Sequence, residues 1–472
     1  MSEARRLIKN TGIIAVGGAA TKLVQFLLLP LYTSVLSTVE YGTVDYLNTV
    51  ALFCVPAVSL LMDEALFRFL IDAGNFDDRK RMVTTSCAIV AVGCALLSLC
   101  SVIWMLLGFG GGFLWVAMLV IAGVSLQMVS AILRGFGETV KYALLNFVAS
   151  FAMIAMNVVF IAVFQWGVAG MLLATILAQA GSSFIFFIWF RMWRYMSISS
   201  LDRGLIGSFV RYSVPLIPNK VSWTIMNMSS RLVIMNALGA ASAGIFAVSY
   251  KFPNVMDQIY GFFYMSWKES SARALNSDED EAAFYNAVYR TLSRFMMSVV
   301  LCMTVLMPTA YSVLIDGAYR EGLKYVPILL MATYFSNISG FYGGIFTAHK
   351  DTGIMGATTI VSAAICLALN LVMIPSVGLY GAAISTLVSM IVVNEYRRIK
   401  VRRHARLAES VRERALTLIS IAVVFGSFYC YIYKGNTLSL IVGLLIAATY
   451  SVVANLAVIR RLIQSITVRH QG

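Results

Sequence analysis

Fourteen hydrophobic runs, each long enough to cross a membrane, constrain the fold of this chain more than any other feature. A helix needs roughly 20 apolar residues to cross about 30 Å of hydrocarbon. We therefore expect an all-α integral membrane protein with about 14 transmembrane helices. The runs occupy residues 10–36, 43–66, 83–107, 113–133, 143–164, 168–190, 212–236, 244–266, 291–315, 325–347, 354–374, 378–395, 415–433 and 438–459.

The basic residues indicate how these helices are oriented. Of the 36 Lys and Arg residues, 28 follow even-numbered runs or lie near a terminus, three lie on the opposite side, and five lie within runs. Loops rich in Lys and Arg remain on the cytoplasmic side. Both termini are therefore predicted to be cytoplasmic. The net charge of +14 follows mainly from this topology, and no folded soluble domain offers a basic face for nucleic acid.

The connections between runs are too short for a catalytic domain. The longest ones, 191–211, 267–290 and 396–414, have about 20 residues each, enough for a helix but not for an independent core. No phosphate-binding loop or serine-nucleophile motif occurs, and the three histidines are too scattered in the sequence for a metal cluster. We expect no enzyme, no cofactor and no metal site. The basic stretch Arg397–Arg406 is expected to anchor the topology or to contact anionic membrane lipids.

Two internal matches predict a repeat. Leu36–Gly42 matches Leu238–Gly244 at an offset of 202 residues, and Gly167–Thr175 matches Gly378–Thr386 at an offset of 211. Each repeat then holds six runs, so both insert in the same direction, and parallel repeats suggest two lobes with a pathway between them. The predicted parts are an N-terminal six-helix lobe at 1–190, a cytoplasmic linker at 191–211, a C-terminal six-helix lobe at 212–395, a basic cytoplasmic loop at 396–414, and two extra helices with a cytoplasmic tail at 415–472.

Five basic side chains lie within the runs, where a charge is costly and usually marks a pathway or a paired structural site. Arg294 lies near a cytoplasmic end and can extend to the interface. Arg231 and Lys251 reach a similar depth, so they repel each other unless an anion lies between them. The only acid near mid-membrane is Asp257, and its pairing with Lys220 is the structural alternative for that lysine. The excess of cations suits a phosphate or diphosphate, with Lys22, Lys220, Arg231 and Lys251 as the candidate ligands.

Amides accompany these cations at helical spacing, so they share helix faces with them. Amide groups suit sugar hydroxyls, although Asn in membrane helices also simply joins neighbouring helices. The candidate sugar contacts are Gln25 beside Lys22, Asn227 on the face of Lys220 and Arg231, and Asn254 and Gln258 on the face of Lys251.

Six short motifs, spread over nearly the whole chain, carry a family resemblance. They are Lys9–Gly12, Leu36–Gly42, Tyr212–Pro218, Gly239–Lys251, Tyr325–Leu330 and Ile374–Ala383. Together they make the chain similar to the oligosaccharide flippases of the MOP exporter superfamily, which also includes lipid II flippases and MATE multidrug antiporters.

This resemblance implies a V-shaped pair of six-helix lobes that transport by alternating access. It implies a bacterial inner-membrane protein that moves undecaprenyl-diphosphate-linked oligosaccharide from the cytoplasmic to the outer leaflet for polysaccharide or O-antigen biosynthesis. The polysaccharide polymerase machinery is then a possible partner. By the same resemblance, Lys22, Arg231 and Lys251 are expected to contact the headgroup.

Ion coupling is the point where the chain departs from the family pattern. Family members often carry an acid in the stretch corresponding to Ser229–Arg231, and this chain has none there. Asp45 and Asp257 are the candidates for binding a proton or a sodium ion, which would favour one arrangement of the lobes. A lipid II flippase and an ion-coupled MATE-type multidrug or organic-cation antiporter are the alternatives. The antiporter would require lumen acids, which are scarce here.

Overall fold

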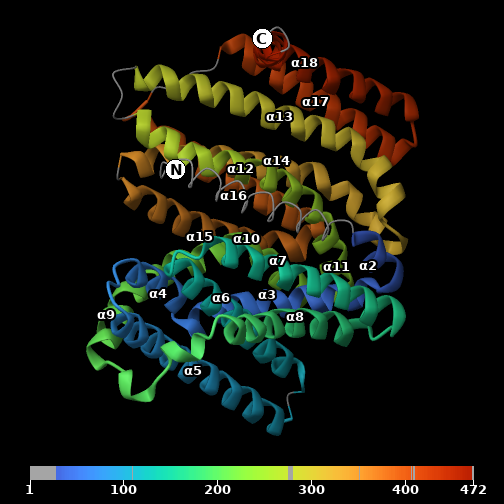
Figure 1. The fold of residues 1–472 in the computed structure, drawn as a ribbon. Coiled ribbons are helices and arrows are strands. Elements are labelled where there is room, and N and C mark those ends of the chain that lie inside the picture. Colours follow the sequence, from blue (N-terminus) through green and yellow to red (C-terminus); the bar gives the residue numbers. More distant parts are fainter. Residues whose placement is uncertain are drawn as a thin grey trace. The chain divides into compact units, whose positions relative to one another are not determined.

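The computed structural model describes residues 28–108, 110–274, 280–349, 351–405, 407 and 410–469. These residues form helices and no strand (Figure 1), which confirms the predicted all-α class. Contacts divide the chain into two compact units, unit 1 ending at Gly244 and unit 2 beginning at Ile245. The lobes, linker and C-terminal segments expected from the repeat stay predictions.

Unit 1 is organised around α3, α4 and α6, whose buried side chains form one apolar core with α5 and α8. Helix α10 packs along α3, so unit 1 continues past residue 211. Its helices are α2 (Leu29–Val35), α3 (Thr38–Ser59), α4 (Met62–Ile71), α5 (Phe76–Leu106), α6 (Gly112–Gly135), α7 (Thr139–Asn157), η1 (Val158–Val163), α8 (Gly167–Trp189), η2 (Met192–Tyr195), η3 (Ile198–Ser200), α9 (Arg203–Ser213), η4 (Val214–Leu216), α10 (Ile217–Leu238) and the start of α11 (Ala240–Ser249).

Unit 2 is organised around α14, which packs against α12, α13, α15 and α16. The Trp267 ring stacks on Phe341 with centroids 4.4 Å apart, and its indole N–H donates to the Phe341 carbonyl at 3.0 Å. A Cβ at Gly344 would lie 2.3 Å from the Trp267 nitrogen, so glycine permits this contact. After α11, the helices are α12 (Lys251–Ala274), α13 (Glu281–Leu314), η5 (Gly317–Tyr325), α14 (Val326–Ala348), α15 (Thr352–Val377), α16 (Leu379–Val401), α17 (Val411–Lys434) and α18 (Thr437–Arg469).

The chain is a multi-pass membrane protein. Among the described residues, nine helices are long and apolar enough to cross a membrane, and the bent pair α3 and α4 adds a tenth. Three further predicted runs form α10, α11 with α12, and α14, which are helical but less apolar than the nine. Of the remaining run, 10–36, residues 10–27 lie outside the described part of the chain, and residues 28–36 contain α2. About 14 transmembrane helices are consistent with this structure.

The two GxxG segments of the predicted repeat have the same local structure. Gly167 begins α8 with φ +53°, and Gly378 directly precedes α16 with φ +67°. Three residues later, a Cβ at Gly170 or Gly381 would lie 3.2 Å or 2.2 Å from a carbonyl oxygen of the preceding helical segment. Glycine is favoured at the first position by its backbone and at the second by close packing.

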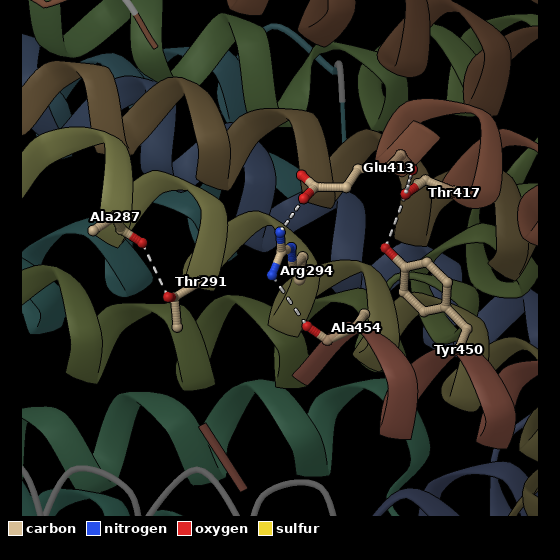
Figure 2. A network of polar contacts seen from close by, with 7 residues as sticks. All are labelled: Ala287, Thr291, Arg294, Glu413, Thr417, Tyr450 and Ala454. Atoms are coloured by element: carbon tan, nitrogen blue, oxygen red, sulfur yellow. Dashed lines mark hydrogen bonds and ion pairs between the residues drawn. The ribbon is translucent and has the colours of Figure 1, made fainter. Parts of the chain in front are cut away.

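A polar seam attaches the C-terminal helices to α13, as Figure 2 shows. Arg294 donates to Glu413 Oε1 at 2.6 Å and to the Ala454 carbonyl at 3.4 Å, and the hydroxyls of Thr417 and Tyr450 are 3.0 Å apart. In Figure 1, α17 and α18 lie beside α13. Arg294, which we expected to extend to the membrane interface, is thus paired with an acid on a neighbouring helix.

Candidate functional site

An ion pair joins α10 to α3 inside unit 1. Arg231 Nη1 lies 2.9 Å from Asp45 Oδ1, and the two side chains are 16% and 14% exposed. One candidate for diphosphate binding is thus paired with one candidate for ion coupling. Our sequence reasoning missed this pairing. Both residues lie a few positions from the predicted outer ends of their runs. This shared depth is the feature of the sequence from which the ion pair could have been predicted.

Two glycines allow α3 and α11 to cross closely near this ion pair. A Cβ at Gly42 would lie 1.9 Å from the Ala240 carbonyl oxygen, and a Cβ at Gly244 would lie 2.1 Å from that of Thr38. No side chain fits at such distances, so only glycine is compatible with the crossing. Gly42 and Gly244 are the last residues of the two matching segments. Equivalent positions of the repeat therefore meet each other.

A capping box sets where α3 begins. Ser37 Oγ accepts a hydrogen bond from the Glu40 backbone N–H at 3.2 Å, and Glu40 Oε2 accepts one from the Ser37 N–H at 2.9 Å. Such a reciprocal pair satisfies two amide donors that a helix start leaves without intrahelical partners. Because α3 begins at Thr38, its second and third turns place Gly42 at the crossing and Asp45 opposite Arg231.

The polar stripe predicted on 212–236 does lie on one helix, α10. At its start Lys220 is exposed, whereas Thr224 is buried and its hydroxyl donates to the Lys220 carbonyl at 3.0 Å. The Asn227 side chain lies outside the described part of the structure. The predicted ion pair between Lys220 and Asp257 is not tested here and stays a prediction.

In unit 2, Lys251 is the first residue of α12, and Asn254, Asp257 and Gln258 follow within its first turns. All four are partly buried. Their helical conformation keeps Lys251, Asn254 and Gln258 on a common face, as their spacing predicts. The two remaining candidates, Lys22 and Gln25, fall outside the described residues.

Arg397 is a buried cation whose burial the sequence reasoning did not predict. We expected it to belong to a basic cytoplasmic stretch, but it is only 8% exposed. Its guanidinium donates to the hydroxyls of Thr358 and Thr359 at 3.0 and 3.2 Å, and to the carbonyls of Ser339 and Met355 at 3.2 and 3.5 Å. No described carboxylate forms an ion pair with it. Uncharged oxygen atoms of α14 and α15 thus form hydrogen bonds with the charged guanidinium of Arg397 on α16.

A signal for this burial was present in the sequence. Thr386, Ser389 and Asn394 precede Arg397 at spacings that keep all four on one face of α16, and all are buried. A polar face on a membrane helix packs against protein or water rather than lipid.

Two histidines that looked scattered in the sequence lie together in unit 2. The rings of His349 and His404 have centroids 4.1 Å apart. His349 Nε2 lies 3.1 Å from Glu281, and His404 Nε2 lies 3.5 Å from Asp351. Within the described part of the chain, no three His, Cys, Asp or Glu side chains form a group that could hold a metal ion.

Comparison with known proteins relates the chain to one family and one fold. A family model described as "Polysaccharide biosynthesis protein" matches residues 7–267, whereas no curated protein sequence matches. The structure entitled "Lipid II flippase MurJ, inward closed conformation" is similar with a TM-score of 0.71 at 12% identity, over 94% of this chain and 99% of that chain.

Two structures of a multidrug resistance MATE family transporter of the MOP superfamily are also similar. The inward-facing conformation has a TM-score of 0.64 at 15% identity, over 81% of this chain and 95% of that one. The outward-facing conformation has a TM-score of 0.57 at 14% identity, over 84% and 95%. At such identities the similarity shows a shared fold.

Proposed function

Because the chain belongs to the family of polysaccharide biosynthesis proteins, we propose that it is a lipid-linked oligosaccharide flippase. It moves undecaprenyl-diphosphate-linked oligosaccharide from the cytoplasmic to the outer leaflet of the bacterial inner membrane by alternating access, with both termini in the cytoplasm. The observation that carries the proposal is the extent of the family match. Residues 7–267 include all four cations proposed to hold the diphosphate, namely Lys22, Lys220, Arg231 and Lys251.

The helices that carry these cations support a polar pathway. Among the described helices, α10 and α12 occupy predicted runs but are less apolar than the nine clear membrane spans. Helices that face lipid must be apolar, so polar ones line protein or water. We assign Gln25, Asn227, Asn254 and Gln258 to the sugar hydroxyls, and Asp257 to coupling with a proton or sodium ion.

Asp45 holds Arg231 in place until the substrate arrives. A guanidinium binds phosphate oxygens through charge-assisted, bidentate hydrogen bonds, and a diphosphate carries more negative charge than a carboxylate. The diphosphate therefore displaces Asp45 from Arg231, and this exchange releases the link between α3 and α10. Substrate binding then favours a different packing of these helices, because the ligand interacts differently with the two arrangements. Asp45 acts in this scheme as a competitor for Arg231 rather than as an ion-coupling residue.

The two alternative transporter functions differ from the proposed one in the ligand that they would bind. A lipid II flippase would bind the same diphosphate with a different saccharide, and the shared fold supports it. The antiporter alternative, which the sequence resemblance raised, would require lumen acids to bind organic cations. The ion pair of Asp45 with Arg231 argues against the antiporter, since it neutralises one of the few candidate acids.

The test is binding of an undecaprenyl-diphosphate glycan to the purified full-length chain. Arg231→Ala and Lys251→Ala should weaken binding at least tenfold, because each removes a charge-assisted contact worth roughly 1.5–3 kcal/mol. Lys324→Ala is the matched control, because Lys324 pairs with Glu321 in the loop that contains η5. Unchanged glycolipid binding in both variants, together with saturable binding of a lipophilic cation, would refute the flippase and favour the antiporter.

A further inference from the structure

Unit 1 contains a polar cavity that none of the candidate residues lines. Its volume is about 190 Å³. At about 30 Å³ per water molecule, this holds roughly six waters, so it offers room for one sugar ring rather than a whole oligosaccharide. Polar side chains from three helices line it: Asp63 from α4, Gln127, Ser130 and Arg134 from α6, and Tyr142 and Asn146 from α7.

A break in the second membrane span brings Asp63 to this cavity. Leu60 and Leu61, which separate α3 from α4, adopt left-handed conformations with φ of 49° and 53°, and the two helices are bent by 51°. Such a conformation is strained for a leucine. Burial maintains it, because Leu61 is 5% exposed and Met62 and Leu66 are fully buried. Strain held by packing is common where a backbone positions a functional group.

The lining offers both donors and acceptors that are open to a ligand. Asp63 Oδ1 is buried and, within the described residues, has no hydrogen-bond partner. Asn146 donates its amide to the Tyr142 carbonyl at 2.9 Å, which leaves its side-chain oxygen as an acceptor. Arg134 lies over the rings of Phe67 and Tyr142 at 4.1 and 5.5 Å, and no described carboxylate pairs with it. Sugar hydroxyls both donate and accept, so they match this mixture.

The charges in the cavity distinguish between ligand classes. Asp63 and Glu64 lie on one wall and Arg134 on another. The two carboxylates repel a diphosphate, and the guanidinium weakens the binding of a metal cation. A neutral polyhydroxy compound can hydrogen-bond to both kinds of group without a net charge of its own.

The position of the cavity agrees with the direction of transport. Asp63 lies near the end of the second predicted run, Arg134 just after the fourth, and Tyr142 just before the fifth. The positive-inside rule places all three points at the cytoplasmic end of the membrane. This is the side on which the proposed function requires the glycan to be received.

We propose that this cavity is a saccharide subsite that binds one neutral sugar of the lipid-linked substrate at its cytoplasmic entry. The inference rests on the proposed function and adds to it a site for recognising the sugar. Asp63 and Gln127 supply the acceptor and the amide that orient the sugar hydroxyls, and Arg134 and Tyr142 complete the lining. The diphosphate binds at the cations, of which Lys220 interacts electrostatically with Asp63, so Gln127 is the residue that tests the sugar alone.

The experiment compares two probes on the full-length protein in detergent: undecaprenyl diphosphate carrying one N-acetylglucosamine, or one galactose, and undecaprenyl diphosphate without sugar. Asp63→Asn and Gln127→Leu should weaken binding of at least one glycosylated probe roughly tenfold and leave the sugar-free probe unchanged. Asp72→Asn is the matched control, because Asp72 is an exposed acid at the end of α4, paired with Arg68. Thermal unfolding verifies that each variant is folded.

Any other result would refute the proposed saccharide subsite. Equal loss for both kinds of probe would show that Asp63 supports the fold or the diphosphate site. Unchanged binding of all probes would leave the flippase intact and remove the subsite. A sodium-dependent rise in melting temperature that Asp63→Asn abolishes would assign the cavity to a cation. If the wild-type protein bound none of the probes, the proposed function itself would fail.

Discussion

Asp45 and Arg231 are 186 positions apart in the sequence, yet their carboxylate and guanidinium approach to 2.9 Å. The pair connects the second predicted membrane run to the seventh, one turn from the point where Gly42 and Gly244 cross. Charge pairing and close backbone contact thus coincide in one small region of unit 1. In the proposed function, this region is the one that substrate must open.

Asp45→Asn and Arg231→Ala should affect binding in opposite directions and stability in the same direction. Breaking a partly buried ion pair leaves one charge without its partner, so each variant should lose up to about 3 kcal/mol of stability. Asp45→Asn should nevertheless bind undecaprenyl-diphosphate glycan more tightly than the wild type, because no carboxylate competes for Arg231. Thermal unfolding and ligand titration measure the two effects. Unchanged or weaker binding by Asp45→Asn would contradict the exchange.

The glycine crossing should tolerate no side chain. Gly42→Ala or Gly244→Ala places a methyl group 1.9 or 2.1 Å from a carbonyl oxygen, so we expect both variants to lose folded, monodisperse protein on size-exclusion chromatography. Gly181→Ala in α8 is the matched control, because nothing lies within 4 Å of its Cβ position. Ala in place of helical Gly should stabilise it by up to about 1 kcal/mol. Normal yields of Gly42→Ala would show that the helices do not cross this closely.

Arg397 should be essential for the stability of unit 2. Its removal takes away the guanidinium hydrogen bonds to four oxygens of α14 and α15, and hydrogen bonds to charged groups contribute roughly 1.5–3 kcal/mol each. We expect Arg397→Ala to lower stability by about 3 kcal/mol or more. Arg397→Lys should restore only part of this stability, because the lysine ammonium lacks the planar, forked set of N–H donors of a guanidinium. Arg403→Ala, at an exposed position, should change the melting temperature little, and an equal effect of both alanine variants would contradict the burial of Arg397.

The ion pair between Arg294 and Glu413 should contribute modestly. The two side chains are 30% and 34% exposed, so screening by solvent limits the coupling to about 1 kcal/mol. A double-mutant cycle of Arg294→Ala and Glu413→Ala, followed by thermal unfolding, measures it. A coupling energy indistinguishable from zero would show that the seam in Figure 2 is held by apolar packing rather than by this pair.

Parts of the candidate site followed from the sequence alone. Helical spacing correctly placed Lys220, Thr224 and Arg231 on one helix, because that pattern depends only on residues close in the chain. The partners of these residues did not follow. The ion pair of Arg231 with Asp45 and the hydrogen bonds of Arg397 join different helices, and spacing within one helix says nothing about which neighbour a face meets.

The sequence by itself determined that this protein lies in a membrane, that it is helical, and that its two halves share glycine motifs. Each of these depends on a local property: the length of an apolar run, its helical spacing, or a short motif repeated at a fixed offset. Only the tertiary structure decided which charges are neutralised and where a polar cavity forms. Packing between distant helices sets both, since burial and charge partners exist only once those helices are brought together.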